Sequence, residues 1–209
     1  MGYDLIVAEI GGVTFAEAQG YVKFLPAYRQ GKIDKKRFDE DKLLSLAAGL
    51  LTSLEISRRT GIRRNRIRFT HGSFGKPYII GSDLQFSISH TCGAVCAAFS
   101  DEGEIGADIE KRSRRVSERL YSRVLNESEK LLVRSEEDFL RIWVQKEAFL
   151  KRLGTGIASD LRGADTTVLR DTRSLECGDY IIGISGKGAD TAEVRVIQLW
   201  DLLEEYNKL

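Results

Sequence analysis

The sequence contains few residues of the types that form disulfides, interrupt helices or bind zinc. It has three cysteines, two prolines and two histidines among 209 residues. An odd number of cysteines in a chain of this length does not make a disulfide framework, which indicates the cytoplasm. The first apolar run, Leu5 to Ile10, is interrupted by Glu9 and is too short for a signal peptide or a membrane span. We therefore expect a cytoplasmic protein that has no contact with membranes.

A charge excess of either sign is missing as well. The 32 Lys and Arg residues nearly cancel the 31 Asp and Glu residues, so the net charge is +1. Because no overall positive field attracts nucleic acid, we expect no nucleic-acid partner. Hydrophobic residues make up 42% of the chain, which is enough to build the core of one domain or of two small ones.

The spacing of apolar residues predicts strands and helices in both parts of the chain. Alternation predicts strands at 3–10, 66–69, 85–89, 94–100, 104–110, 180–184 and 193–199. Spacings of three and four predict helices at 15–25, 43–60 and 137–153, the last two ended by Gly61 and Gly154. Asn126 and Glu129 are typical of a capping box, and 101–103 of a hairpin turn. Strands followed by helices in both halves indicate an α+β fold.

Two carboxylates stand two residues apart on the strand predicted at 104–110. Side chains at this spacing share one face of a strand, so Asp108 and Glu110 project together. They repel each other unless a proton or a cation lies between them, and Mg²⁺ binds through one or two carboxylates plus substrate phosphates. The alternative is a solvated strand end beside Lys111 and Arg112.

A second charged pair lies on the helix predicted at 137–153. Glu147 and Lys151 are four residues apart and therefore share a face. One alternative is an exposed ion pair of little energetic weight. However, the pair continues the apolar stripe of Leu140 and Val144, which directs both charges toward other protein or a cleft.

The remaining candidate groups have weaker patterns. His90 has Cys92 and Cys96 nearby, but a closed zinc site needs four ligands at set spacings, and no second pair is close. We expect Cys92, Cys96 and Cys177 to be small buried residues. The glycine-containing loop at 72–77 is too short for a Walker loop and is expected to be a turn.

Four segments, read in order, resemble the surfactin-synthetase-type 4′-phosphopantetheinyl transferases. They are FGKP at 74–77, FSISHT at 86–91, IGADIE at 105–110 and WVQKEAFLK at 143–151. Each is weak alone, but their order and separation are specific, and residues 25–48 look similar too. The resemblance favours the functional interpretation of both charged pairs.

The resemblance implies a fold and a reaction. The fold has two similar α/β halves, 1–104 and 105–209, with the active site in the cleft between them. The reaction moves 4′-phosphopantetheine from coenzyme A to a serine of an apo acyl or peptidyl carrier protein, depends on Mg²⁺ and releases 3′,5′-ADP. Because one chain carries both halves, we expect a monomer.

The resemblance also implies roles for individual residues. The expected Mg²⁺ ligands are Asp108, Glu110 and Glu147. Glu147 is also the expected acceptor of the serine proton, and Lys151 contacts the pyrophosphate and donates a proton to the leaving group. The expected coenzyme A contacts are Lys76, Pro77, Ser89 and His90, with Arg29 and Lys32 at the 3′-phosphate.

One position departs from the family pattern. Leu44 stands where the family often has an arginine, and Lys42 is the candidate substitute. Two other functions stay open on the sequence. One is a Mg²⁺-dependent, nucleotide-using transferase with a small-molecule acceptor, and the other is a coenzyme A-binding module without catalysis. Tests with different acceptors distinguish the two enzymatic functions. The sequence does not indicate which carrier protein is modified.

Overall fold

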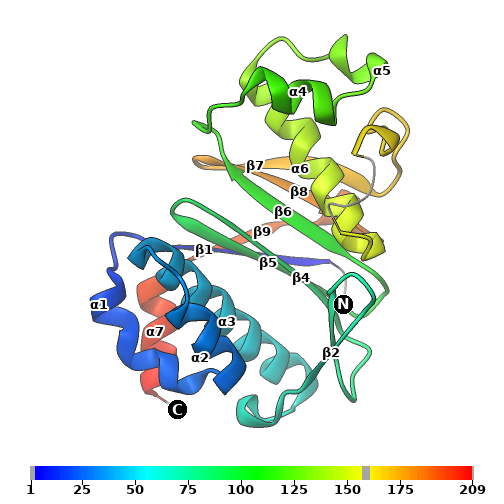
Figure 1. The fold of residues 1–209 in the computed structure, drawn as a ribbon. Coiled ribbons are helices and arrows are strands. Elements are labelled where there is room, and N and C mark those ends of the chain that lie inside the picture. The colour runs from blue at the N-terminus through cyan, green and yellow to red at the C-terminus, as the bar shows by residue number, and fades with distance from the viewer. Residues whose placement is uncertain (1–2, 157–160, 209) are drawn as a thin grey trace.

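Two β-sheets face each other in the middle of the molecule, and helices cover the outer face of each (Figure 1). The computed structural model describes residues 3–156 and 161–208. The first sheet has the order β4 (Gln85–Thr91), β5 (Ala94–Ser100), β1 (Asp4–Glu9) and β9 (Val194–Gln198). The second sheet has the order β6 (Gly106–Lys111), β8 (Tyr180–Ser185) and β7 (Thr172–Cys177). A short hairpin, β2 (Phe69–His71) with β3 (Pro77–Ile79), stands beside them.

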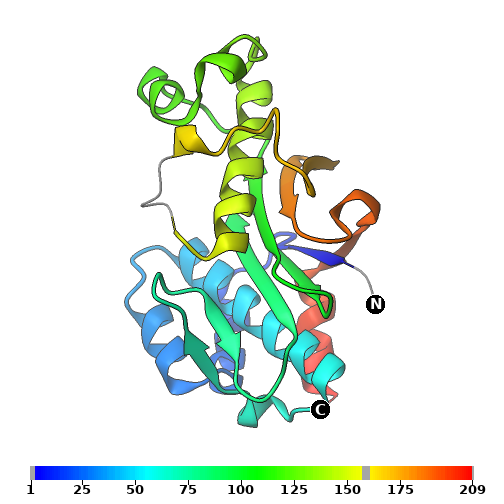
Figure 2. The same cartoon turned by 90° about the vertical axis from the view of Figure 1, so that its right-hand side faces the viewer.

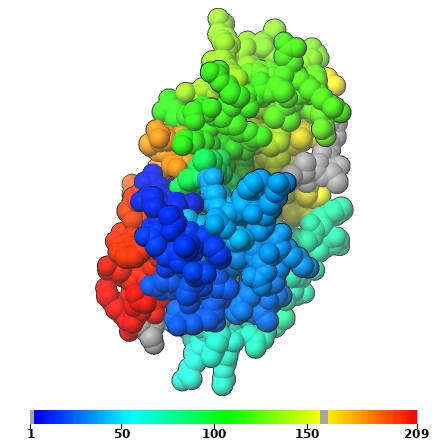
Figure 3. Space-filling model, turned by 60° about the vertical axis from the view of Figure 1, so that its left-hand side comes forward, coloured from blue at the N-terminus to red at the C-terminus, as the bar shows by residue number. Residues whose placement is uncertain are grey.

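Each half has its own helices. The helices beside the first sheet are α1 (Phe15–Ala18), α2 (Ala27–Asp34) and α3 (Asp39–Thr60), with 3₁₀ turns at Gln19–Phe24 and Arg64–Arg66. They are joined by α7 (Leu199–Asn207) from the C-terminal end of the chain. The second half has α4 (Glu118–Val124), α5 (Glu127–Lys130) and α6 (Glu136–Leu153), with 3₁₀ turns at Leu161–Gly163 and Ala189–Thr191. Figure 3 shows the N-terminal helices, in blue, below the green second half.

Strand β1 is apolar on both faces because it lies between two hydrophobic layers. Ile6 points into the layer that β5, α3 and α7 share. Leu5 and Val7 point into the layer between the two sheets, where Ile109 and Ile182 meet them. This position explains why the N-terminal run is almost continuously hydrophobic rather than alternating.

Helix α6 lies directly on the second sheet, and two glycines make this possible. A Cβ atom on Gly106 of β6 would be 1.8 Å from the carbonyl oxygen of Ala148. A Cβ atom on Gly183 of β8 would be 1.9 Å from the carbonyl oxygen of Val144. Only glycine therefore permits this separation between the helix and the sheet.

Several local predictions are confirmed. Helices α3 and α6 end at Gly61 and Gly154, whose φ angles of 71° and 66° are left-handed. The capping box at Asn126 and Glu129 is present.

Three local predictions are wrong. Residues 15–25 do not form one α-helix, since α1 gives way to a 3₁₀ turn that contains Gly20. Residues 101–103 do not close a hairpin, because β5 pairs with β4 and β1 while β6 pairs with β8. Cys92 is exposed at the turn after β4, whereas Cys96 is buried and Cys177 partly buried.

The end of the chain returns to its beginning. Residues 101–105 link β5 to β6, where we expected one half to end. After β8, strand β9 pairs in parallel with β1, and α7 packs on α3, as Figure 2 shows for the red C-terminal segment. The second sheet thus lies between two stretches of chain that belong to the first. Within the described residues, no helix is long and apolar enough to span a membrane.

The glycine contact predicts a stability effect. Gly106→Ala should lower the free energy of unfolding by about 3 kcal/mol or more, because the new methyl group meets helix backbone that cannot move independently. Urea unfolding measures this loss. The control is Gly31→Ala on α2, where an added Cβ meets no atom within 4 Å and should stabilise the protein by less than ~1 kcal/mol. Equal effects of the two substitutions would contradict the close approach.

Candidate active site

Three elements from both halves meet at Asp108. The carboxylate lies on β6 and is buried, with its Oδ1 accepting a hydrogen bond of 2.7 Å from Ser89 Oγ of β4. Lys151 Nζ of α6 donates to the same oxygen at 2.7 Å and to the carbonyl oxygen of Ala107 at 3.2 Å. The structure therefore brings together Ser89, Asp108 and Lys151, which are spread over more than sixty residues of the sequence.

Glu147 lies one helical turn before Lys151 and is buried. Its Oε1 and the Oδ2 of Asp108 are buried without a hydrogen-bond partner. Burial, and then the negative charge of Asp108, raise the pKa of Glu147 to about 7, although Lys151 and Arg114 act in the opposite direction. Two unsatisfied carboxylate oxygens in one buried place call for a proton or a cation.

Glu110 shares the strand face of Asp108, as expected, but its carboxylate is already engaged. It accepts hydrogen bonds from Thr91 Oγ1 at 3.1 Å and from Trp143 Nε1 at 3.2 Å, and it forms an ion pair with Arg114. In the described parts of the chain, no three His, Cys, Asp or Glu side chains are grouped so that they could hold a metal ion. Glu110 would have to release Arg114 to join the other two carboxylates.

The open oxygens nevertheless fit a hard cation. Asp108 Oδ2 and Glu147 Oε1 are unpartnered carboxylate oxygens, the ligand type that Mg²⁺ takes.

His90 lies at the basic side of this cluster. Although the His90 residue is exposed, partial desolvation of its ring lowers its pKa. The positive charges of Lys36 and Lys151 lower this pKa further, whereas Asp41 and Asp108 act in the opposite direction. The ring is therefore mostly neutral at pH 7 and can both donate and accept hydrogen bonds. Lys36 was not among the expected site residues, and the only signal for it in the sequence is the basic stretch at 29–42.

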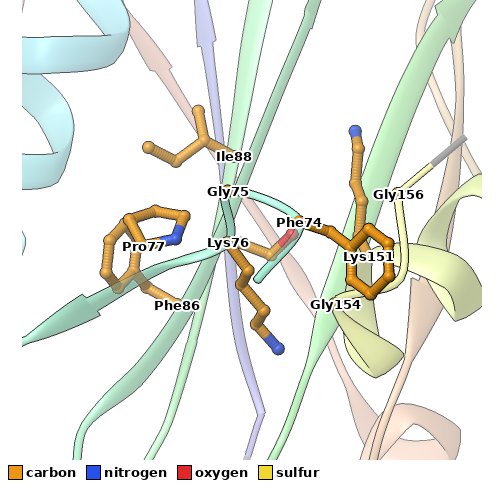
Figure 4. Close-up of a pocket in the computed structure, with 10 residues that line it drawn as sticks. Phe74, Gly75, Lys76, Pro77, Phe86, Ile88, Lys151, Gly154 and Gly156 are labelled. Carbon is orange, nitrogen blue, oxygen red and sulfur yellow. The ribbon is translucent and has the colours of Figure 1, made fainter. Parts of the chain in front are cut away.

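A cavity of about 210 Å³ lies beside the cluster, with walls from both halves. The first wall is the loop between β2 and β3, with Pro77 at the start of β3 and part of β4. The second wall is Lys151 with Gly154 and Gly156 at the end of α6 (Figure 4). Lys76 also lines the cavity, but its ammonium group points away from that of Lys151.

The expected 3′-phosphate contacts lie outside this cavity lining. Arg29 and Lys32 are on α2, with Lys32 near the ring of Tyr28. Lys42 forms an ion pair with Asp39 at 2.9 Å, and Leu44 is buried in the core.

One buried pair was missed by the sequence reasoning. Lys146 and Glu129 have fully buried side chains and form an ion pair at 2.5 Å. Lys146 also donates to the carbonyl oxygens of Val124 and Leu161, both at 2.8 Å. Thus Lys146 connects α4 and α5 to α6.

Comparisons with known proteins agree with this geometry. Residues 14–102 match the family described as "4'-phosphopantetheinyl transferase, N-terminal", and residues 104–187 match the "4'-phosphopantetheinyl transferase superfamily". The 4′-phosphopantetheinyl transferase Sfp of Bacillus subtilis (strain 168) is 30% identical over 78% of this chain and 75% of its own length. The chain belongs to the 4′-phosphopantetheinyl transferase superfamily.

Two further relatives lie in the same family. The 4′-phosphopantetheinyl transferase ffp of Bacillus subtilis is 30% identical over 78% of this chain and 76% of its own length. The L-aminoadipate-semialdehyde dehydrogenase-phosphopantetheinyl transferase of Saccharomyces cerevisiae is 29% identical, over 68% of this chain and 58% of its own length.

Membership confirms the resemblance found in the four segments and the expected α+β fold with two halves. The chain is an enzyme, and as a phosphopantetheinyl transferase it uses coenzyme A as its substrate. The two matched regions meet in the linker between β5 and β6.

The raised pKa of Glu147 predicts how stability depends on pH without divalent cations. An unfolded glutamate has a pKa near 4.5, so the folded state binds the extra proton between about pH 5 and pH 7 and loses stability as the pH rises. Glu147→Gln should therefore be more stable than the wild type at pH 8, by at least ~1 kcal/mol, and little different at pH 5. Urea unfolding in EDTA at both pH values measures this difference.

The control for this measurement is Glu204→Gln on the exposed side of α7. It should give the same difference from the wild type at both pH values. A Glu147→Gln variant that loses stability at pH 8 would contradict the burial of an unpaired charge.

Proposed function

We propose that this transferase moves the 4′-phosphopantetheine group of coenzyme A to a serine of an apo acyl or peptidyl carrier protein and requires Mg²⁺. The observation that carries the proposal is the pair of unpartnered carboxylate oxygens on Asp108 and Glu147 next to the Lys151 ammonium group. Pyrophosphate chemistry needs this combination of cation ligands and a fixed positive charge.

Asp108 and Glu147 are the proposed ligands of the ion, with Glu110 as the third after it releases Arg114. When bound, Mg²⁺ would neutralise charge on the pyrophosphate.

Lys151 is placed to act on the leaving group. Its Nζ uses two hydrogen bonds inside the protein, to Asp108 and to Ala107, and its side chain is 31% exposed at the cavity wall. We infer that its remaining N–H contacts the pyrophosphate and supplies a proton as 3′,5′-ADP departs.

Glu147 is the proposed acceptor of the serine proton, directly or through one water molecule. Without a bound cation, burial and the charge of Asp108 raise the pKa of Glu147 to about 7, so its carboxylate is more basic than that of an ordinary glutamate. A bound cation would lower this pKa and keep the group ionised at neutral pH. Because Oε1 is the proposed ligand oxygen, the second carboxylate oxygen, Oε2, would take the proton.

The coenzyme A contacts are proposed from the surroundings of the cluster. Pro77 lines the cavity, and Ser89 donates a hydrogen bond to Asp108. His90 lies near enough to Lys36 and Lys151 for their positive charges to lower its pKa. Arg29 and Lys32 are the proposed 3′-phosphate contacts on α2. We further propose that the enzyme is a cytoplasmic monomer whose reaction involves neither nucleic acid nor a membrane. Its three cysteines, all unpaired, suit a reducing compartment.

The first test is the reaction itself. Apo acyl, peptidyl and aminoadipate-reductase carrier domains, incubated with the enzyme, coenzyme A and Mg²⁺, should gain the mass of one phosphopantetheine on their serine. Asp108→Ala and excess EDTA should each abolish the gain, since both remove cation binding. The readout is intact-protein mass spectrometry.

Two results would contradict the proposal. Absence of a mass gain on every carrier, with folded enzyme and Mg²⁺ present, would exclude carrier proteins as acceptors. Full transfer in EDTA would exclude the metal.

The second test concerns Glu147 and Lys151. Glu147→Gln keeps the shape but removes the basic group, so single-turnover transfer should slow by at least ~10²-fold. Lys151→Ala should also slow it, and the double variant should lose less than the product of the two factors because both residues serve one transition state.

The matched control is the exposed ion pair of Glu127 and Lys130 on α5, at 2.6 Å. Neutralising either residue should change stability by less than ~1 kcal/mol and leave transfer unchanged. A near-wild-type rate for Glu147→Gln would refute its role.

A further inference from the structure

Lys76 has no hydrogen-bond donor to spare. Its side chain is only 8% exposed, and its ammonium group forms an ion pair with Glu104. The same nitrogen donates to the carbonyl oxygens of Arg152 at 2.8 Å and Ile105 at 3.3 Å. A lysine ammonium has three N–H groups, and each has an acceptor here. Lys76 therefore could not bind a phosphate without giving up an internal bond.

The three acceptors come from two parts of the chain, and Lys76 belongs to a third. Lys76 itself lies in the loop between β2 and β3 of the first half. Glu104 and Ile105 belong to the linker that joins the two halves, and Arg152 is in the last turn of α6. A cation at the C-terminal carbonyl oxygens of a helix is favoured by the helix dipole. One side chain thus connects both halves and the linker.

Further contacts hold this arrangement in place. Tyr78 Oη donates to Glu104 Oε1 at 3.3 Å. The stem of Lys76 packs on Gly154, where an added Cβ would be 3.3 Å from the Lys76 Cδ. Gly154 in turn follows the helix end that carries Lys151.

These bonds span the two walls of the cavity. Phe74 lies on the loop that carries Lys76, and Pro77 begins the strand after it. Lys151 and Gly154 lie at the end of α6 (Figure 4). The bond from Lys76 to Arg152 ties one wall to the other. Without it, the loop and the helix end would be free to separate.

We propose that Lys76 is a positioning residue that fixes the distance between the two walls of the cavity, instead of a ligand for a coenzyme A phosphate. This inference rests on the proposed function in one respect, that this cavity receives coenzyme A. It replaces the role that the sequence resemblance implies for the Lys76 side chain.

The test compares the binding of two ligands by calorimetry. In Lys76→Met, the Kd of coenzyme A and the Kd of 3′-dephospho-coenzyme A should rise by the same factor, about tenfold, because both ligands meet the same displaced walls. Lys32→Ala, a proposed phosphate contact, should raise the Kd of coenzyme A alone. Hydrogen exchange of the ligand-free protein should accelerate in segments 72–75 and 150–156 for Lys76→Met but not for Lys32→Ala.

The substitution Glu104→Gln should change the Kd of coenzyme A in opposite directions for the two possible roles of Lys76. If Lys76 holds the walls, weakening its ion pair should raise both Kd values by a smaller common factor. If Lys76 binds a phosphate, removing the competing carboxylate should tighten coenzyme A. The matched control is Lys187→Met, which breaks an exposed 2.9 Å ion pair with Glu102 in the same linker and should change neither Kd nor exchange.

Three results would overturn the inference. They are a loss confined to coenzyme A in Lys76→Met, tighter binding in Glu104→Gln, and a fall in thermal stability with both Kd values unchanged. The exchange and binding measurements need no carrier protein. Failure of phosphopantetheine transfer would therefore count against the proposed function and leave this test intact.

Discussion

The site depends on how closely α6 approaches the second sheet. Gly106 and Gly183 let the helix backbone lie where any Cβ atom would collide with it. At this separation Lys151 reaches the Asp108 carboxylate at 2.7 Å, and Glu147 is buried beside it. A helix held farther away would leave the lysine in solvent and the glutamate hydrated. Gly106 therefore permits the close approach that brings Lys151 and Glu147 to Asp108.

The close approach of α6 to the second sheet also creates an electrostatic conflict, because it buries two carboxylates whose charges the fold does not fully compensate. Asp108 and Glu147 are both buried, yet only one oxygen of Asp108 receives hydrogen bonds from Ser89 and Lys151. Glu110, on the same strand face, has three partners and no such conflict. Unsatisfied polar atoms cost stability, and they persist where a ligand supplies the missing partner. This conflict is the reason why we propose a cation between the two carboxylates.

Local sequence patterns predicted faces and ends well because these depend on near neighbours. Periodicity predicts where α3 and α6 end, each at a glycine. It also predicts that Asp108 and Glu110 share a face and that the Glu147 side chain points toward other protein. Periodicity does not say which strand is the partner. Strands β4 and β1 pair with the two edges of β5. The turn at 101–103 therefore connects two sheets and does not close a hairpin. Nor could it pair Lys146 with Glu129, which meet only through the tertiary fold.

Three lysines on or near α6 differ in how many ammonium N–H groups are used in hydrogen bonds inside the protein. Lys146 is fully buried, with Glu129 and two carbonyl oxygens as acceptors, and it holds helices together. Lys76 also has three acceptors. Lys151 has two, Asp108 and the carbonyl oxygen of Ala107, and its side chain is partly exposed at the cavity. All three carry the same charge, and the sequence places each in a motif of the same family. The number of N–H groups left after internal bonding differs. Of the three lysines only Lys151 keeps one, which is why we propose it as the contact for negative charge that develops on the leaving group.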